Sequence, residues 1–183
     1  MSGSEEALAR MTIERLGDRH APHLLIGGYG MGFTLRAALK ALGPGARIIV
    51  AELVAGIIEW ARGPMAHMTQ DCLEDSRVEI RIEDVARLID RGRASYDAVL
   101  LDVDNGPDGL TRQANDGLYS ARGLASARAA LRPGGLLAIW SAGADATFTK
   151  RLKHAGFTVD EMRVRARENG KGPTHTIWFA TIS

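Results

Sequence analysis

The chain has 183 residues, of which 45% are hydrophobic and 25% charged, and its formal net charge is +1. A chain of this length buries a substantial core, so we expect one domain over 1–183 with a helical segment at 1–20. The near-neutral charge gives no reason to expect nucleic acid or a membrane surface as a partner. The single cysteine, Cys72, excludes an internal disulfide and fits a reducing compartment.

No apolar run approaches the ~18 residues of a membrane helix. The polar, acidic start at residues 2–6 is not a signal peptide. We therefore expect a cytoplasmic protein.

Strand-like and helix-like segments alternate along the chain. Apolar runs predict strands at about 23–28, 46–51, 77–82, 96–102 and 135–141. Helical patterns between them predict helices at about 32–42, 54–62, 85–90 and 121–131. Strands that are apolar along nearly their whole length are typical of a parallel sheet covered by helices on both faces.

The C-terminal part predicts an antiparallel hairpin. A helix at about 145–155 precedes strand-like alternation at Phe157–Arg165 and His175–Thr181, and the turn-forming residues 168–173 separate the two. Five parallel strands followed by this hairpin predict an α/β fold. It would be a Rossmann-like, doubly wound seven-stranded sheet with an antiparallel last strand, which is the class I methyltransferase fold.

A glycine-rich turn, Gly28-Tyr29-Gly30-Met31-Gly32, joins the first predicted strand to the next helix. Glycines let the backbone approach a ligand, which the free N–H groups of the first helical turn then face. The third glycine comes one residue earlier than in a dinucleotide fingerprint, and there is no Gly-Lys-Ser/Thr motif, so phosphate cradling is not expected. The G-x-G-x-G form is seen in S-adenosylmethionine enzymes of the Rossmann-like class. A purely structural turn is the alternative.

Acidic residues end the next two predicted strands. Glu52 comes roughly 20 residues after the glycines, where a carboxylate can hold both ribose hydroxyls. Asp84 follows the third strand and could accept a hydrogen bond from an adenine amino group, with the Val85 backbone nearby. Alternatively, Asp84 only caps the helix that it opens. Because the carboxyl ends of parallel strands meet at one edge of a sheet, these residues predict a site for an adenosine-type cofactor.

Three carboxylates follow the fourth predicted strand, at Asp102, Asp104 and Asp108. Repulsion between close carboxylates raises the pKa of at least one and can produce a general base. A solvated turn is the alternative, and it applies least to Asp102, which directly follows the apolar run. His175 begins the last strand beside the same edge and could contact the substrate, or be an ordinary strand-end histidine. The other histidines have no metal-ligand spacing with one another or with Cys72, so no metal is expected.

Together these residues resemble the spermidine synthase family and its bacterial relatives. The segments that carry the resemblance lie within about residues 20–142: they are residues 25–32, Glu52, residues 75–78, Glu83-Asp84, Tyr96–Asp102, Leu118-Tyr119-Ser120 and residues 131–135. The resemblance implies that Glu52 holds the ribose, Asp84 the adenine and Asp102 the amine to be alkylated. Several of these motifs are shared with methyltransferases generally, so they indicate the fold and nucleoside binding more strongly than the reaction.

Three departures from the family pattern bear on the reaction. Aminopropyltransferases of the family carry an aspartate at the position of Gly30, and it pairs with the amino group of decarboxylated S-adenosylmethionine. The family's second aspartate falls at Asn105, one residue after Asp104, which leaves Asn105 as a substrate contact. The family's N-terminal β-domain, which helps to cover the site and to form the dimer, is expected to be missing. A homodimer is still possible.

The sequence therefore predicts an S-adenosylmethionine-dependent transferase, with methyl transfer to a small amine as the leading hypothesis. With Gly30 in place of an acid, backbone N–H groups can receive the carboxylate of the intact cofactor. The alternatives are a polyamine aminopropyltransferase that uses decarboxylated S-adenosylmethionine, and a non-catalytic nucleoside-binding module. The predicted site comprises Asp102 and Asp104 for catalysis, Gly28, Tyr29, Gly30, Gly32, Glu52, Asp84 and Val85 for the cofactor, and Asn105 and His175 for the substrate.

Overall fold

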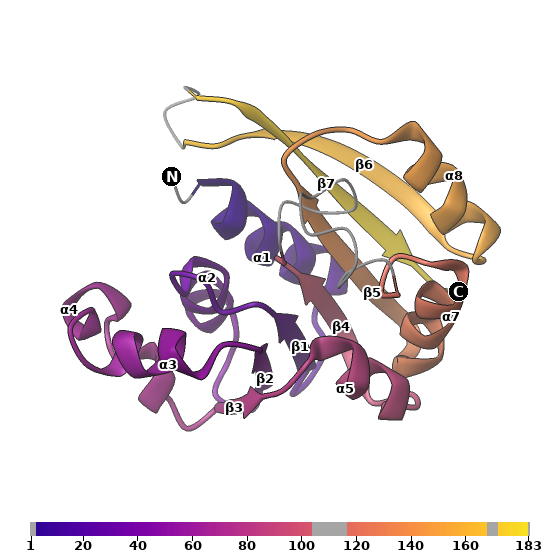
Figure 1. Cartoon of the computed structure of the whole chain (residues 1–183). Helices are drawn as coiled ribbons and strands as arrows, with labels where there is room; N and C mark the ends of the chain where they lie inside the picture. Colours follow the sequence, from indigo (N-terminus) through magenta and orange to yellow (C-terminus); the bar gives the residue numbers. More distant parts are fainter. Residues whose placement is uncertain (1–2, 104–116, 168–171, 183) are drawn as a thin grey trace.

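The computed structural model describes residues 3–103, 117–167 and 172–182, and its strands form one seven-stranded sheet (Figure 1). The strands are β1 (His23–Gly27), β2 (Arg47–Glu52), β3 (Val78–Ile82), β4 (Tyr96–Leu101), β5 (Leu131–Ser141), β6 (Thr158–Arg165) and β7 (Thr174–Thr181). Their order in the sheet is β3-β2-β1-β4-β5-β7-β6. Strands β1 to β5 pair in parallel, and β7 runs antiparallel to both β5 and β6. This topology confirms the predicted class I methyltransferase fold.

Helices cover both faces of the sheet. They are α1 (Gly3–Leu16), α2 (Phe33–Ala41), α3 (Ala55–Arg62), α4 (Ala66–Thr69), α5 (Val85–Arg91), α7 (Ala121–Ala130) and α8 (Ala146–His154), with a 3₁₀ turn at Cys72–Glu74. Apolar side chains of α1, α2 and α3 pack on one face, and those of α5, α7 and α8 pack on the other. The short α4 and the 3₁₀ turn were not predicted.

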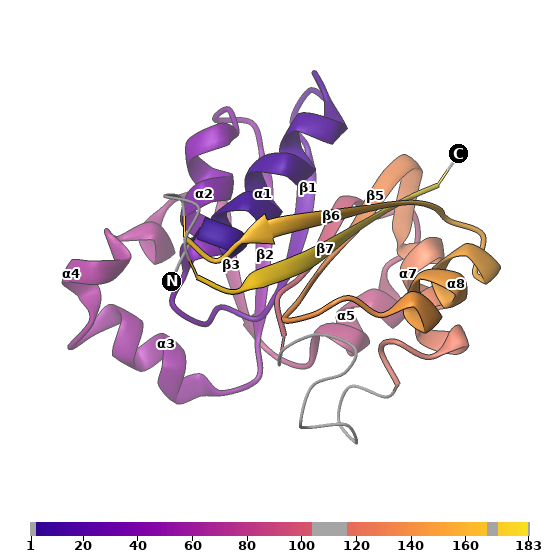
Figure 2. The same ribbon diagram turned by 90° about the horizontal axis from the view of Figure 1, so that it is seen from above.

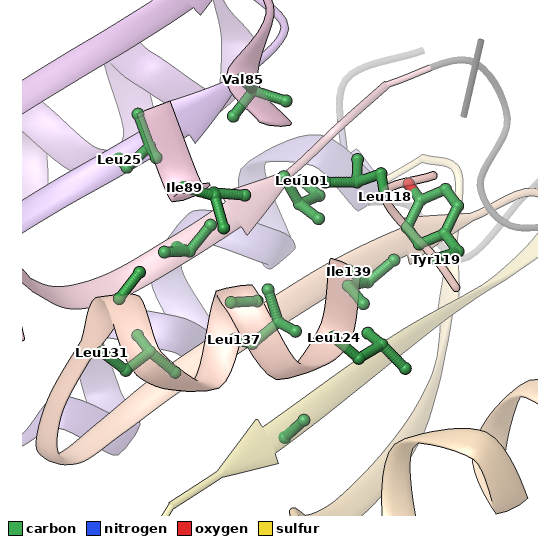
Figure 3. Packing of buried hydrophobic residues seen from close by; sticks show 14 of the residues in the cluster. Leu25, Val85, Ile89, Leu101, Leu118, Tyr119, Leu124, Leu131, Leu137 and Ile139 are labelled. Carbon is green, nitrogen blue, oxygen red and sulfur yellow. The ribbon is translucent and has the colours of Figure 1, made fainter. Parts of the chain in front are cut away.

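Alternation along the strands divides the core into two clusters. In β4, Val99 and Leu101 point to the cluster under α5 and α7, part of which Figure 3 shows, while Ala98 and Leu100 point to the opposite face. All six residues of β4 are buried, because helices cover this strand on both sides. Each fully buried leucine of this kind contributes roughly 1.5–3 kcal/mol to stability. β4 is therefore a rigid support for whatever follows its carboxyl end.

Strand β5 begins at Leu131, four residues before the predicted start at 135. The Pro133-Gly134-Gly135 segment lies inside the strand, where it shifts the register: Leu131 lies opposite Tyr96, and regular pairing resumes with Leu136 opposite Ala98. Proline has no N–H to give to a ladder, so it is tolerated at an irregularity of this kind.

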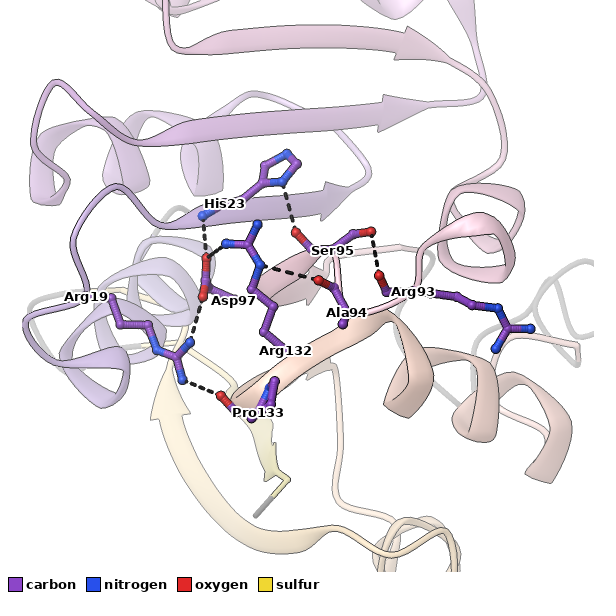
Figure 4. Close-up of polar contacts among 8 residues, drawn as sticks. All are labelled: Arg19, His23, Arg93, Ala94, Ser95, Asp97, Arg132 and Pro133. Carbon is purple, nitrogen blue, oxygen red and sulfur yellow. Dashed lines mark hydrogen bonds and ion pairs between the residues drawn. The ribbon is translucent and has the colours of Figure 1, made fainter.

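A buried carboxylate fastens the amino ends of three strands at this irregularity (Figure 4). Asp97 of β4 accepts hydrogen bonds from the Arg19 guanidinium at 2.6 Å, the Arg132 guanidinium at 2.8 Å and the backbone N–H of His23 at 2.8 Å. Burial by itself raises the pKa of Asp97, but the His23 and Arg19 hydrogen bonds and the two positive charges outweigh it and hold the pKa below its ordinary value. Asp97 thus ties β4 to the starts of β1 and β5, at the edge of the sheet opposite the predicted site.

Candidate functional site

The turn after β1 passes so close to the end of β4 that only glycine fits at its first position. Gly28 has φ +86°, and a Cβ added there would lie 2.5 Å from the carbonyl oxygen of Asp102. Backbone hydrogen bonds hold this approach, because Gly28 N–H donates to the Ala51 carbonyl and Asp102 N–H donates to the Gly27 carbonyl. The ends of β1, β2 and β4 therefore meet at one point, as predicted for the site.

The rest of the turn leaves backbone groups accessible. Gly30 has φ +53°, and apart from its two chain neighbours no atom of the described residues lies within 4 Å of the position that its Cβ would take. Gly32 is the N-cap of α2, and no side chain caps this helix. Within the described residues, no side chain accepts a hydrogen bond from the first-turn N–H groups of α2, and free N–H groups at a helix N-terminus can receive an anionic group.

Glu52 lies at the end of β2 and is buried, with 6% of its surface exposed. One carboxylate oxygen accepts the backbone N–H of Tyr29 at 2.9 Å, and the other accepts the backbone N–H of Val54 at 2.9 Å. Glu52 therefore joins the glycine turn to the segment after β2. Each carboxylate oxygen has a further lone pair, so the residue can still accept hydrogen bonds from a ribose.

Two of the predicted cofactor residues have side chains that serve the fold. The Tyr29 ring is buried, and its hydroxyl lies 3.6 Å from the Cys72 sulfur. The Val85 side chain is buried and packs against Gly27. The Tyr29 N–H is already used by Glu52. Their placement at the end of the sheet agrees with the prediction, but any contact to a ligand would come from the backbone.

Asp84 caps α5, because its carboxylate accepts the backbone N–H of Ala86 at 2.8 Å. The side chain is otherwise exposed, so capping leaves room for a contact with an adenine amino group.

Large apolar side chains stand exposed at the same edge. Leu53 is 70% exposed, Val54 54% and Ile82 51%, and they directly follow Glu52 or precede Glu83-Asp84. Pockets for small molecules are lined mainly by apolar groups with a few polar ones, and a nucleoside base would cover such side chains. These residues were not predicted as part of the site, although their positions directly beside two predicted ligand-binding carboxylates were a usable signal.

Asp102 follows β4 and faces the start of α2. Its carboxylate accepts a hydrogen bond from the Thr34 hydroxyl at 2.9 Å. Burial raises the pKa of Asp102 to about 6; the Thr34 hydrogen bond opposes this shift, and the negative charge of Glu5 adds to it. Asp102 thus has one protein donor within the described residues and a proton affinity close to that of a histidine, which suits a group that exchanges protons near neutral pH.

The first turn of α1 extends this cluster toward β7. The Ser4 hydroxyl donates to the Glu5 carboxylate at 3.0 Å and also lies 2.9 Å from Nδ1 of His175. The His175 ring stands edge-on to Trp140, with 4.7 Å between the ring centres. Burial lowers the pKa of His175, although Glu5 opposes this shift. Asp102 and His175 are therefore both near enough to Glu5 for its charge to act on their pKa values.

Trp140 belongs to this group because its ring packs against His175 and its indole Nε1 is buried. Across the residues that the structure places, this N–H has no hydrogen-bond partner. Ser4, Glu5 and Thr34 were not predicted. Only the rotation of α1 decides whether Glu5 or Glu6 faces the sheet, and the sequence of this helix does not fix that rotation.

The remaining predicted residues, Asp104 and Asn105, lie outside the described residues, as does Asp108. Their roles stay predictions. Within residues 3–103, 117–167 and 172–182, no three histidine, cysteine, aspartate or glutamate side chains gather as metal ligands would. In the same part of the chain, no helix combines the length and the apolar character required to cross a membrane.

The fold and the residues at the sheet's carboxyl edge define an α/β domain of the class I methyltransferase type. Residues 4–152 match the spermine/spermidine synthase domain, so the chain belongs to that family. It is also similar to polyamine aminopropyltransferase 2 of Pseudomonas aeruginosa, with 32% identity over 120 residues, which are 63% of this chain and 32% of that protein. The chain thus spans about a third of the length of this curated relative.

Solved structures agree with this fold. Spermidine synthase from Thermotoga maritima superposes with a TM-score of 0.76 at 19% identity, over 98% of this chain and 60% of that one. A spermidine synthase in complex with the transition state analogue AdoDATO gives 0.75 at 19% identity, over 98% and 59%. The 1,6-didemethyltoxoflavin-N1-methyltransferase of Burkholderia thailandensis gives 0.69 at 24% identity, over 100% and 79%. The predicted resemblance is confirmed, and at these identities the structural likeness shows the fold alone.

Proposed function

We propose that the protein transfers an alkyl group from an adenosyl sulfonium donor to the nitrogen of a small amine. The family and the polyamine aminopropyltransferase relative favour aminopropyl transfer from decarboxylated S-adenosylmethionine. They support this alternative better than methyl transfer, which was the leading hypothesis from the sequence.

The observation that carries the proposal is the position of Asp102. It follows a fully buried strand, lies against the glycine turn through its own backbone, and sits beside a second carboxylate, Glu5. Two carboxylates in a partly buried place attract a cationic amine. An amine bound there would lie next to the turn that is proposed to hold the donor.

The residues proposed to bind the donor still have hydrogen-bond acceptors or apolar surface available. Glu52 keeps lone pairs for ribose hydroxyls, and Asp84 keeps an exposed carboxylate for the adenine amino group. Leu53 and Ile82 offer exposed apolar surface to the base. The residues present therefore fit an adenosyl group, whose sulfonium supplies an activated carbon and a good leaving group when the donor is bound.

The chain's own contribution to the reaction would be alignment and proton removal. A protonated amine must lose a proton before its nitrogen has a lone pair for attack, and Asp102 would take this proton. The neutral nitrogen then bonds to the donor carbon as the carbon–sulfur bond breaks, and the sulfur leaves as a neutral thioether with the electron pair of that bond. A pKa of about 6 brings the carboxylate closer to the working pH than an ordinary aspartate and so makes it a better base. Glu5 would hold the positive charge of the acceptor while this occurs.

Methyl transfer from intact S-adenosylmethionine is the second candidate, because Gly30 replaces an acid of the aminopropyltransferases that the sequence resembles. The space around the Gly30 Cβ position is open, so a carboxylate of the donor would meet backbone N–H groups there and no negative charge. Positive φ values are tolerated best by glycine, asparagine and aspartate. Gly30→Asp should therefore fold.

The test is calorimetry of both donors with the unaltered protein and with Gly30→Asp, followed by transfer assays with 1,3-diaminopropane and 1,4-diaminobutane. Aminopropyl transfer to a diamine would support the first candidate, and methyl transfer with ten-fold tighter binding of the intact donor, about 1.4 kcal/mol, would support the second. Gly30→Asp should shift the donor preference toward the decarboxylated form. Donor binding without transfer to any amine would favour a binding module, and no binding of either donor would refute the proposal.

A further inference from the structure

A groove on the outer side of α1 and α2 is separate from the candidate site. It has a volume of about 1150 Å³ and is lined by α1, α2, Gln70 and the end of β6. α1 lies between α2 and the β6–β7 hairpin (Figure 2), and Gly3 N–H donates to the carbonyl of Ala166, which directly follows β6 on the way to β7. The groove shares the first turn of α2 with the candidate site, but no side chain assigned above to the donor or the acceptor lines it.

The groove is strongly cationic. Five of its lining side chains are basic and only Glu6 is acidic; the basic ones are Arg10, Arg36, Lys40, Arg165 and Arg167. Arg10 pairs with Glu14 at 2.9 Å. The other four have no ion pair with any residue whose position is described. Because the whole chain has a net charge of only +1, this is a local concentration of positive charge.

The floor of the groove is formed by small apolar side chains. Ala37 and Ala41 lie one helical turn apart on α2, and Ala7 of α1 and Val164 of β6 complete the surface. Of the lining residues only Phe33 is aromatic, and the Arg36 guanidinium lies over its ring at 4.7 Å. The groove thus combines a floor of small apolar side chains with a rim of positive charge.

We propose that this groove binds an acidic, amphipathic helical segment of a partner protein. Glutamate or aspartate side chains would pair with the rim, and apolar side chains of the segment would lie on the alanine floor, as helices do in hydrophobic grooves. The volume exceeds the roughly 300–1,000 Å³ of small-molecule pockets, which suits a chain segment. Single-stranded nucleic acid fits less well, because its bases stack on several aromatic rings, and the lining has the one ring of Phe33, over which the Arg36 guanidinium lies.

The test uses a fluorescein-labelled peptide of about four helical turns with glutamate on one face and leucine on the other. Fluorescence anisotropy should show saturable binding that weakens as salt is raised. A peptide with glutamine in place of glutamate, and one with serine in place of leucine, should each bind at least ten-fold more weakly. These two peptides separate the contribution of the rim from that of the floor.

Matched variants locate the binding. Arg36→Glu/Lys40→Glu should weaken the peptide at least ten-fold, whereas Lys150→Glu/Lys153→Glu, exposed on α8 with the same change of charge, should not. Ala37→Trp fills the floor without changing charge and should also weaken binding. Circular dichroism confirms that each variant is folded.

Three outcomes would overturn the proposal. The first is the absence of saturable binding at physiological salt, or binding that survives Arg36→Glu/Lys40→Glu. The second is tighter binding of single-stranded DNA of equal charge through the same side chains, which would make the groove a nucleic-acid surface. The third is a dimer that dissociates in Arg36→Glu/Lys40→Glu and excludes the peptide, which would make it a contact between two copies.

Discussion

Strand β4 has a carboxylate near each end, and the surroundings shift the pKa values of the two in opposite directions. Asp97, at the amino end, accepts three hydrogen bonds from Arg19, Arg132 and His23, and its pKa is lowered. Asp102, at the carboxyl end, accepts one from Thr34 and lies near a like charge, and its pKa is raised to about 6. A carboxylate that accepts several hydrogen bonds from the protein stabilises the fold, whereas one that accepts few is available to a ligand.

The largest expected effect is on turnover by Asp102→Asn. Asparagine keeps the shape and the Thr34 hydrogen bond but cannot take a proton, so turnover should fall by roughly 10²-fold or more, the usual scale for losing a positioned base. Donor affinity should change by only a few-fold. Single-turnover transfer with saturating donor measures this. In the unaltered protein the rate should rise with pH through about 6, since Asp102 must be ionised. Full activity of the Asp102→Asn variant would show that Asp102 is not the base.

Asp97→Asn should instead act on stability. Asparagine keeps one acceptor oxygen but puts an NH2 group where the other oxygen accepted, and it removes the negative charge that faces two arginines, which should cost about 2–4 kcal/mol in the free energy of unfolding. Because the folded pKa is lowered, this contribution is present above the unfolded pKa, near 3.9, and is lost as the pH falls through the folded value. Urea unfolding at several pH values measures it. Asp160→Asn, an exposed partner of Arg15, is the control and should change little.

Glu52→Ala tests whether one carboxylate can serve both the fold and the site. It leaves the buried N–H of Tyr29 and the partly buried N–H of Val54 without their acceptor, so unfolding should become easier by about 1–3 kcal/mol. Donor binding should weaken by roughly 1–3 kcal/mol because a charged acceptor is lost. Calorimetry and urea unfolding separate the two effects, with the exposed Glu59→Ala as the control. Normal donor binding by a folded Glu52→Ala would remove Glu52 from the site.

Asp102→Asn should also stabilise the protein at pH 7.5, by about 1–2 kcal/mol, since ionising a poorly partnered carboxylate opposes folding. The folded pKa of about 6 lies above the unfolded value, so the native state takes up this proton first as the pH falls. The advantage of asparagine should therefore shrink between about pH 6 and pH 4. Unfolding of both proteins at pH 7.5 and pH 4 checks this, and a loss of stability at pH 7.5 would contradict it.

The smallest effect is expected from Thr34→Val. It removes the hydroxyl that lowers the pKa of Asp102, so the acid limb of the pH–rate profile should move to higher pH by less than about one unit. Glu5→Gln removes a charge that raises this pKa and should move the limb the other way. Shifts in the same direction would show that Asp102 is not the group that titrates.

The fold was predictable because its signals are local and repeated. Apolar runs separated by glycine and proline located the strands, and parallel strands necessarily place Glu52, Asp84 and Asp102 at one edge. The partners of these residues were not predictable. Glu52 bonds to the N–H of Tyr29 because two turns happen to approach, and Glu5 reaches the site only through the docking of α1. Contacts of this kind depend on how helices and strands pack together. The spacing of residues along one sequence does not reveal this packing.

The contacts that hold the start of α1 include hydrogen bonds from Gly3 N–H to the Ala166 carbonyl, between Ser4 and His175, and from the Thr34 hydroxyl to the Glu5 carbonyl. Helix ends usually fray, with opening free energies close to zero. Here, fraying of the first turn would carry Glu5 away from Asp102 and break these contacts. The acceptor side of the site would then open at the rate at which this helix end unfolds. Amide hydrogen exchange in α1, with and without an amine, would therefore report how often the site admits its substrate.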